Sequence, residues 1–126
     1  MVWLDDRKQK RDVAHAKRLI AGELLQAHTM LSVIASQRVF RTSADIATLF
    51  PVTAWQQYSA QLEGITDDVR DAMVQVYSEL LVMRGSYVWA IVEQSGGTLT
   101  PEMADQIRRT DADVIKLRTM LIEELL

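Results

Sequence analysis

Histidines are the side chains of this sequence best suited to metal binding or proton transfer at neutral pH. His15 and His28 fall in one predicted helix, but their spacing is not a whole number of turns, so they cannot bind one ion together. The sequence contains no Glu-x-x-His pair, the ligand pattern of di-iron helical bundles. It also contains no cysteine, which excludes thiol catalysis, disulfides and cysteine-bound metals. We therefore predict no metal site and no cofactor.

Carboxylates cluster at two places that could be mistaken for acid–base pairs. Asp67, Asp68 and Asp71 fit the first turns of a helix, where negative charge is stabilised by the helix dipole. Asp111 and Asp113 are interpreted as part of an exposed helix face. Serines and threonines are frequent, but no histidine converges with them in a way that predicts a triad. We expect no catalytic residue and a protein that is not an enzyme.

Three long segments carry apolar residues at steps of three and four, which predicts helices over about 5–37, 66–94 and 101–124. Thr66 is expected to cap the second of these helices, and Thr100 followed by Pro101 the third. The pattern predicts an all-α fold, an antiparallel bundle of three long helices.

The connection after the first long helix is expected to hold one or two short helices. Thr42 or Ser43 could cap the first, and Pro51 then interrupts any helix. Thr53 is the expected cap of the second, and Gly64 suits its left-handed end. We expect this segment to lie across the bundle.

Composition is that of one folded domain. A chain of 126 residues, 48% hydrophobic and 25% charged, can bury its own core, so residues 1–126 are expected to form a single helical-bundle domain. The longest uncharged stretch, 24–37, is too short and too polar to cross a bilayer, so no transmembrane helix is expected in it. A cytoplasmic location follows as the default for a chain without cysteine.

The helix predicted over 66–94 is apolar on more than one face. Leu80 lies on its core stripe, whereas Val82 and Trp89 point to the opposite side with Gly85 beside them. Either the segment around Trp55 packs over this second face, or the face is the interface of a homodimer or of another protein partner, where tryptophan is over-represented. Val82, Gly85 and Trp89 are therefore candidate interface residues.

One charge lies close to the core stripe of the same helix. Arg84 is placed there by the helical spacing, and a buried charge is costly without a partner. We expect either an ion pair with a carboxylate such as Glu23 on the first helix, or a long side chain that carries its charge out to solvent.

The beginning of the chain combines an aromatic residue with a basic cluster. Trp3 is followed by Arg7, Lys8, Lys10 and Arg11, the pattern of a chain that leaves a membrane on its cytoplasmic side. These five residues are candidates for contact with a membrane or another anionic surface; the alternative is that Trp3 packs on the bundle. Nucleic acid is a weaker prediction, because the isoelectric point is 5.3 and no helix is rich in Arg, Asn and Gln.

This start and the later segment Leu49-Phe50-Pro51-Val52-Thr53-Ala54-Trp55 carry a resemblance. Together they resemble a class of uncharacterised bacterial membrane-anchored helical proteins, in which a transmembrane helix continues into a basic helix and a Leu-Pro-(Thr/Ser)-x-Ala-Trp segment follows. Phe50 and Val52 depart from that pattern, and the transmembrane helix is missing. The resemblance implies a helical domain at the inner face of a membrane, with no known activity.

We therefore expect a non-enzymatic helical protein-interaction domain, and one form of this prediction is the cytoplasmic part of a membrane-anchored protein. The alternatives are a soluble dimeric adaptor or phage or toxin-partner accessory protein, and a nucleic-acid-associated protein that uses the basic N-terminus.

Overall fold

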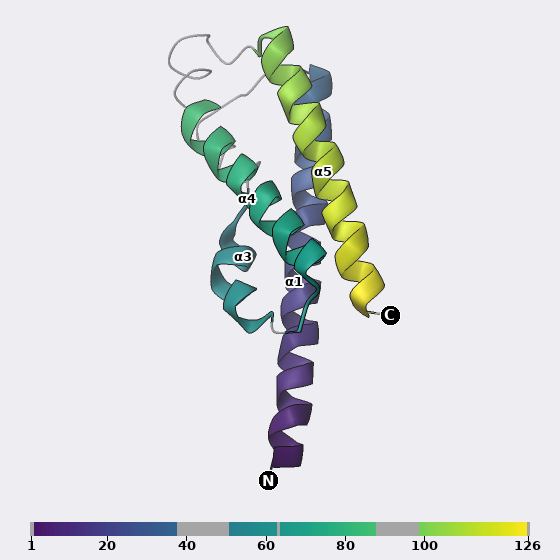
Figure 1. The fold of residues 1–126 in the computed structure, drawn as a ribbon. Helices are drawn as coiled ribbons and strands as arrows, with labels where there is room; N and C mark the ends of the chain where they lie inside the picture. The colour runs from purple at the N-terminus through teal and green to yellow at the C-terminus, as the bar shows by residue number, and fades with distance from the viewer. Residues whose placement is uncertain (1, 38–50, 63, 88–98, 126) are drawn as a thin grey trace.

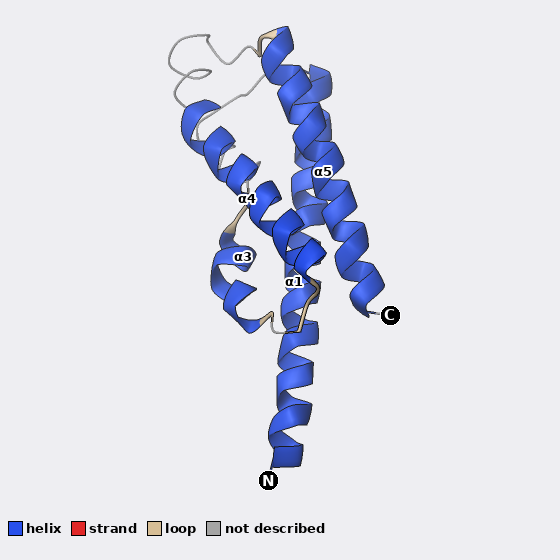
Figure 2. Cartoon of the chain, in the orientation of Figure 1, coloured by secondary structure: helices blue, strands red, loops and turns tan. Residues whose placement is uncertain are grey.

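The computed structural model describes residues 2–37, 51–62, 64–87 and 99–125 (Figure 1). They form α1 (Val2–Gln37), α3 (Thr53–Tyr58), the 3₁₀ helix η1 (Ser59–Gln61), α4 (Asp67–Tyr87) and α5 (Pro101–Leu125). No strand occurs among these residues (Figure 2), so the predicted all-α class is confirmed for this part of the chain. The short helix expected near Thr42 or Ser43 and the helix end expected near Gln94 lie outside the described residues.

The start of α4 is capped as predicted. The carbonyl of Thr66 accepts the N–H of Arg70 at 3.1 Å, and its hydroxyl accepts the N–H of Val69 at 3.4 Å. Gly64, just before this cap, has a φ of 81°, a left-handed conformation that glycine adopts without steric cost.

The start of α5 follows the same rule. The carbonyl of Thr100 accepts the N–H of Ala104 at 3.0 Å, and its hydroxyl accepts the N–H of Met103 at 3.2 Å. Pro101 occupies the first helical position, where no N–H is needed. The predicted caps at Thr66 and Thr100 are both confirmed.

The start of α3 differs from the prediction. Thr53 is the first residue of the helix, and Val52 before it offers no side-chain cap. Instead, the carboxylate of Glu23 on α1 accepts the N–H of Ala54 at 2.6 Å and that of Trp55 at 3.2 Å. Two free N–H groups of this short helix are thus satisfied by a side chain of another element.

The long helices lie side by side, with α5 running back along α1 and α4 leaning across them (Figure 1). The core faces of all three helices meet between them, at the three- and four-residue spacing expected from the sequence. The largest fully buried side chains are those of Tyr77, Ile20, Leu24, Leu31, Leu80, Ile107, Leu117 and Leu121. Burying each such leucine or isoleucine stabilises the fold by about 1.5–3 kcal/mol relative to leaving it exposed.

The first part of α1 projects beyond the other helices (Figure 1). Ala16 is the first buried residue of α1 among those whose side chains are described. We call residues 2–15 the N-terminal arm.

The segment Lys10–Ser36 of α1 is long and apolar enough, by length and composition alone, to cross a membrane. The uncharged stretch of the sequence over 24–37 is shorter than this segment, because Glu23 directly precedes it. In an 18-residue window of this segment 44% is buried, and a core helix of a folded bundle and a signal sequence can both have the same composition.

Candidate functional site

A buried carboxylate ties three helices together. Glu23 is 8% exposed, and besides capping α3 it accepts a hydrogen bond from the Tyr77 hydroxyl at 2.8 Å. The rings of Tyr77 and Trp55 stack with centroids 4.9 Å apart and planes 10° from parallel. Burial raises the pKa of the Tyr77 phenol above its ordinary value, and the charge of Glu23 and their hydrogen bond raise it further. Tyr77 therefore stays protonated at neutral pH and serves as a structural donor.

Of the two interpretations of Arg84, the pairing with Glu23 is wrong, and the side chain that reaches solvent agrees with the structure. The carboxylate of Glu23 faces Tyr77, about two turns of α4 before Arg84, and its oxygens are taken by Tyr77 and by the start of α3. Arg84 itself is only half-buried, so its charge keeps access to solvent.

A second polar cluster joins α1 to α5. His28 Nδ1 lies 2.7 Å from Asp111 Oδ1, and the Ser32 hydroxyl donates to Asp111 Oδ2 at 3.3 Å. The placement of Asp111 on an exposed face is therefore wrong: its side chain is 14% exposed, because His28 and Ser32, one turn apart on α1, meet it across the helix pair. In a hydrolase triad the histidine lies between the serine and the carboxylate. Here the carboxylate lies between the other two, so the cluster is a bridge between helices.

The other histidine lies apart from this cluster. His15 makes an edge-to-face contact with the ring of Tyr58 at 6.1 Å. Within the described ranges, no group of three or more His, Asp or Glu side chains is placed to hold a metal ion.

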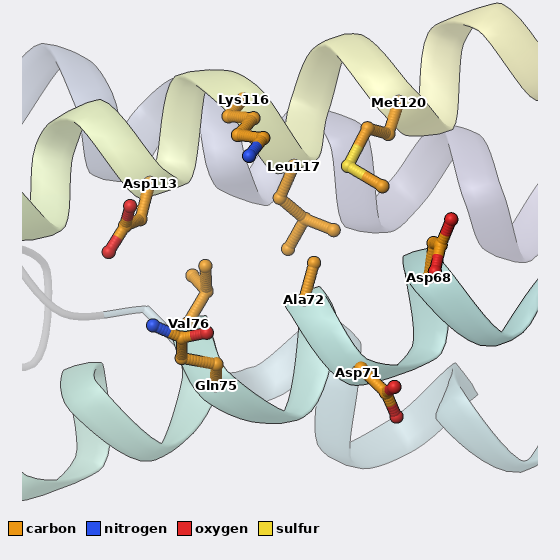
Figure 3. Close-up of a pocket in the computed structure, with 9 residues that line it drawn as sticks. All are labelled: Asp68, Asp71, Ala72, Gln75, Val76, Asp113, Lys116, Leu117 and Met120. Atoms are coloured by element: carbon orange, nitrogen blue, oxygen red, sulfur yellow. The ribbon is translucent and has the colours of Figure 1, made fainter.

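A groove of about 430 Å³ lies between α4 and α5, a size within the range of ligand-binding pockets. In Figure 3, Leu117 extends from α5 towards Ala72 and Val76 on α4, and these side chains form an apolar floor together with Met120. The groove is lined by Asp68, Asp71, Ala72, Gln75, Val76, Asp113, Lys116, Leu117 and Met120.

The rim of the groove is acidic. Asp68, Asp71 and Asp113 contribute three carboxylates, against the single ammonium group of Lys116. Among the residues that the structure describes, none of these carboxylates is engaged in a hydrogen bond or an ion pair. An apolar floor below unengaged carboxylates can receive a cation with a long aliphatic stem, as arginine and lysine have.

The candidate interface of α4 is exposed where it is described. Val82 is 64% exposed and Val74 and Leu81, on the same side of the helix, are 55% and 38% exposed. A methyl group built on Gly85 would meet no atom within 4 Å. Because Trp55 stacks on Tyr77, its segment leaves Val82 uncovered. Trp89, the third candidate, lies outside the described residues.

The candidate anion-binding residues lie on the N-terminal arm. Arg7, Lys8, Lys10 and Arg11 are exposed, and Trp3 belongs to the first turn of α1, with its side chain outside the description. Val82 and Gly85 belong to the last turns of α4, and that end of α4 lies at the opposite end of the molecule from the arm (Figure 1), so the structure does not bring the two candidate sites together.

By its described fold the chain belongs to the all-α class of proteins. It matches no protein-family model, no curated protein and no solved structure. The proposal for its function therefore rests on the surfaces described above.

Proposed function

We propose that the protein is a non-enzymatic helical interaction domain whose groove between α4 and α5 receives a cationic helical segment of a protein partner. The observation that carries the proposal is the apolar floor of this groove below the carboxylates of Asp68, Asp71 and Asp113. Laying a helix into an apolar groove is a common mode of peptide recognition.

The chemistry of the groove selects the charge of the partner. Arginine and lysine stems can cover Val76 and Met120, while their charged ends reach the carboxylates. An acidic or purely apolar helix would leave the carboxylates desolvated without a partner, which is unfavourable.

In this proposal α5 runs antiparallel to both α1 and α4, within the antiparallel bundle expected from the sequence. Two contacts support this frame. Lys17 Nζ on α1 lies 3.2 Å from Glu124 Oε2 on α5, and the Thr66 hydroxyl, at the start of α4, donates to Glu124 Oε1 at 3.2 Å. The two helices that line the groove are thus held at one end by a shared carboxylate.

A synthetic peptide tests the groove directly. We expect an alanine-based helical peptide of about 15 residues, with arginines four residues apart, to bind the intact protein in fluorescence anisotropy. Asp71→Asn should raise its dissociation constant about threefold, as expected for the loss of one solvent-exposed ion pair. Asp67→Asn is the matched control, because its carboxylate lies on α4 one turn before Asp71 but does not line the groove. The absence of binding, or an equal loss in both variants, would refute the proposal.

The side of α4 that exposes Val74, Leu81 and Val82, which we call the outer face of α4, supports a second candidate function. This function is a homodimer through Val82, Gly85 and Trp89. The specific observation is the exposure of Val82, Val74 and Leu81 along one side of the helix. A dimer of this kind should be lost in Val82→Glu and kept in Ile115→Glu, which changes a residue of similar exposure on α5. Light scattering of both variants measures this, and equal masses in both would eliminate the candidate.

A further inference from the structure

We infer that the occupant of the groove is the N-terminal arm of a second copy of this chain, so that two copies exchange arms. This inference rests on the proposed function of the groove and names its partner. Three features of the described residues carry it: the shape of the arm, its position beside the groove, and its charge.

The arm is a helix whose described side chains between Arg7 and Asp12 are exposed, and His15 near its end contacts Tyr58. It continues α1 without interruption, and its exposed residues include Lys8, Lys10 and Arg11. Arg7, Arg11 and Arg18 are spaced by four and seven residues, so they lie along one face of α1. Ile20 and Leu24 lie on the opposite, core-facing side of the same helix.

The arm leaves the bundle at the end where the groove begins. The contacts of Glu124 with Lys17 and Thr66 bring α1, the start of α4 and the end of α5 to one point. The groove starts within one turn of that point, at Asp68 on α4 and Met120 on α5.

The arm cannot fill the groove of its own chain while α1 stays helical. It points away from the bundle as a direct continuation of α1 (Figure 1), and turning back would break the helix near Ala16. A second copy, related by a twofold axis near this end of the bundle, can instead lay its arm along the groove and accept the first arm in return. Such a reciprocal contact closes after two copies.

The lengths are compatible with this exchange. At the rise of an α-helix, residues 2–15 span about 20 Å, whereas the part of α4 that lines the groove, from Asp68 to Val76, spans about 12 Å. The arm can therefore cover the whole groove and leave its first turns beyond it.

The charges of arm and groove are complementary. Residues 1–20 carry six basic and three acidic side chains, and the remaining residues carry the acidic excess of the chain. On the arm, the spacing of Asp5 and Asp12 places them away from the face of Arg7 and Arg11. That face meets three carboxylates and one ammonium group in the groove. The same carboxylates, so close to the arm, would repel an anionic membrane.

Two charge-reversed forms of the full chain test the exchange. The first carries Asp68→Lys and Asp71→Lys in the groove, and the second carries Arg7→Glu and Arg11→Glu on the arm. By sedimentation equilibrium at low salt we expect the unmodified chain to be a dimer. Each reversed form should raise the dimer dissociation constant at least about tenfold.

The mixture of the two forms is the decisive sample. In it, each reversed arm finds an oppositely charged groove, so an equimolar mixture should regain the dimer that each form lacks alone. This recovery also shows that both forms are folded. If Asp68→Lys disturbs the start of α4, Asp113→Lys replaces it, because this substitution reverses a charge of the groove on α5.

Several results would overturn the inference. A monomer at every concentration would do so, while arginine-peptide binding that depends on Asp71 would leave the proposed function of the groove standing. A dimer that survives both reversals but is lost in Val82→Glu would move the interface to the outer face of α4. Binding to phosphatidylglycerol vesicles that requires Arg7 and Arg11, in a chain that stays monomeric, would assign the arm to a membrane.

Discussion

At the scale of single residues, the most connected side chain is Glu23. A buried carboxylate is costly unless donors surround it, and here two backbone N–H groups and one hydroxyl do so. The carboxylate thereby fixes α3 and Tyr77 on α1. The stability of the short helix α3 thus depends on a residue outside it.

Replacing this carboxylate should strongly lower the free energy of unfolding. Glu23→Ala leaves the Tyr77 hydroxyl and the N–H groups of Ala54 and Trp55 without their acceptor, and we expect the free energy of unfolding to fall by about 3 kcal/mol. Urea unfolding followed by circular dichroism measures the loss. Tyr77→Phe, which removes only one of the three hydrogen bonds, should cost about 1.5 kcal/mol. Losses of equal size in the two variants would contradict this account.

The raised pKa of Tyr77 predicts a dependence on alkaline pH. Because the phenol has a higher pKa in the folded than in the unfolded protein, its contribution to stability is complete below about pH 10, the ordinary tyrosine pKa, and is lost as the pH rises further. The difference in unfolding free energy between the natural chain and Tyr77→Phe should therefore change above that pH. A difference that stays constant up to alkaline unfolding would exclude the effect.

Local signals could be predicted from the sequence, and long-range ones could not. The caps at Thr66 and Thr100 act on residues three or four positions away, so the sequence shows them directly. Glu23 meets Ala54 and Tyr77 across 31 and 54 residues. Helical periodicity gives the direction of a side chain but not which helix it faces. It therefore could not show that Glu23 contacts Tyr77 and not Arg84.

At the scale of the elements, the groove depends on how α4 and α5 pack. Asp68 and Asp71 were explained from the sequence by the helix dipole, which accounts for their position in the chain but not for the space beside them. The sequence does contain one signal of the groove, a residue spacing that α4 and α5 share. Asp68, Asp71 and Gln75 repeat the spacing of Asp113, Lys116 and Met120, so each set lies on one face beside the core stripe of its helix.

Glu124 joins three elements at one end of the bundle. Desolvation would raise the pKa of its carboxyl, but the hydrogen bonds of Thr66 and the charge and hydrogen bond of Lys17 lower it below the usual value. A carboxyl with a lowered pKa stabilises the folded protein above its unfolded pKa, and this stability is lost as the pH falls through the folded pKa.

We therefore expect Glu124→Gln to lower the free energy of unfolding by about 1 kcal/mol at neutral pH. The difference should shrink as the pH falls below about 5, because the natural carboxyl then becomes protonated as well. Glu123→Gln, a change at the exposed neighbouring residue, is the control and should be neutral. A Glu124→Gln deficit that persists in acid would show that the lost ion pair is not its cause.

At the scale of the whole molecule, the arm and the core-forming part of α1 are separate parts of one helix. Since Ala16 is the first buried residue of α1 among the described side chains, removing residues 2–11 should change the thermal midpoint of the monomeric bundle by no more than about 2 °C. Differential scanning calorimetry at low protein concentration measures this. A much larger decrease would mean that the arm contributes to the core.

The pairing of α1 with α5 also has a consequence for biosynthesis. The contact between His28 and Asp111 joins residues that are 83 positions apart, and α5, which is translated after α1 and α4, covers the core face of α1. While the ribosome is still translating, Ile20, Leu24 and Leu31 have no α5 to bury them. Nascent chains that end before α5 should therefore bind chaperones and aggregate, and synthesis of α5 should end this exposure of the core face of α1.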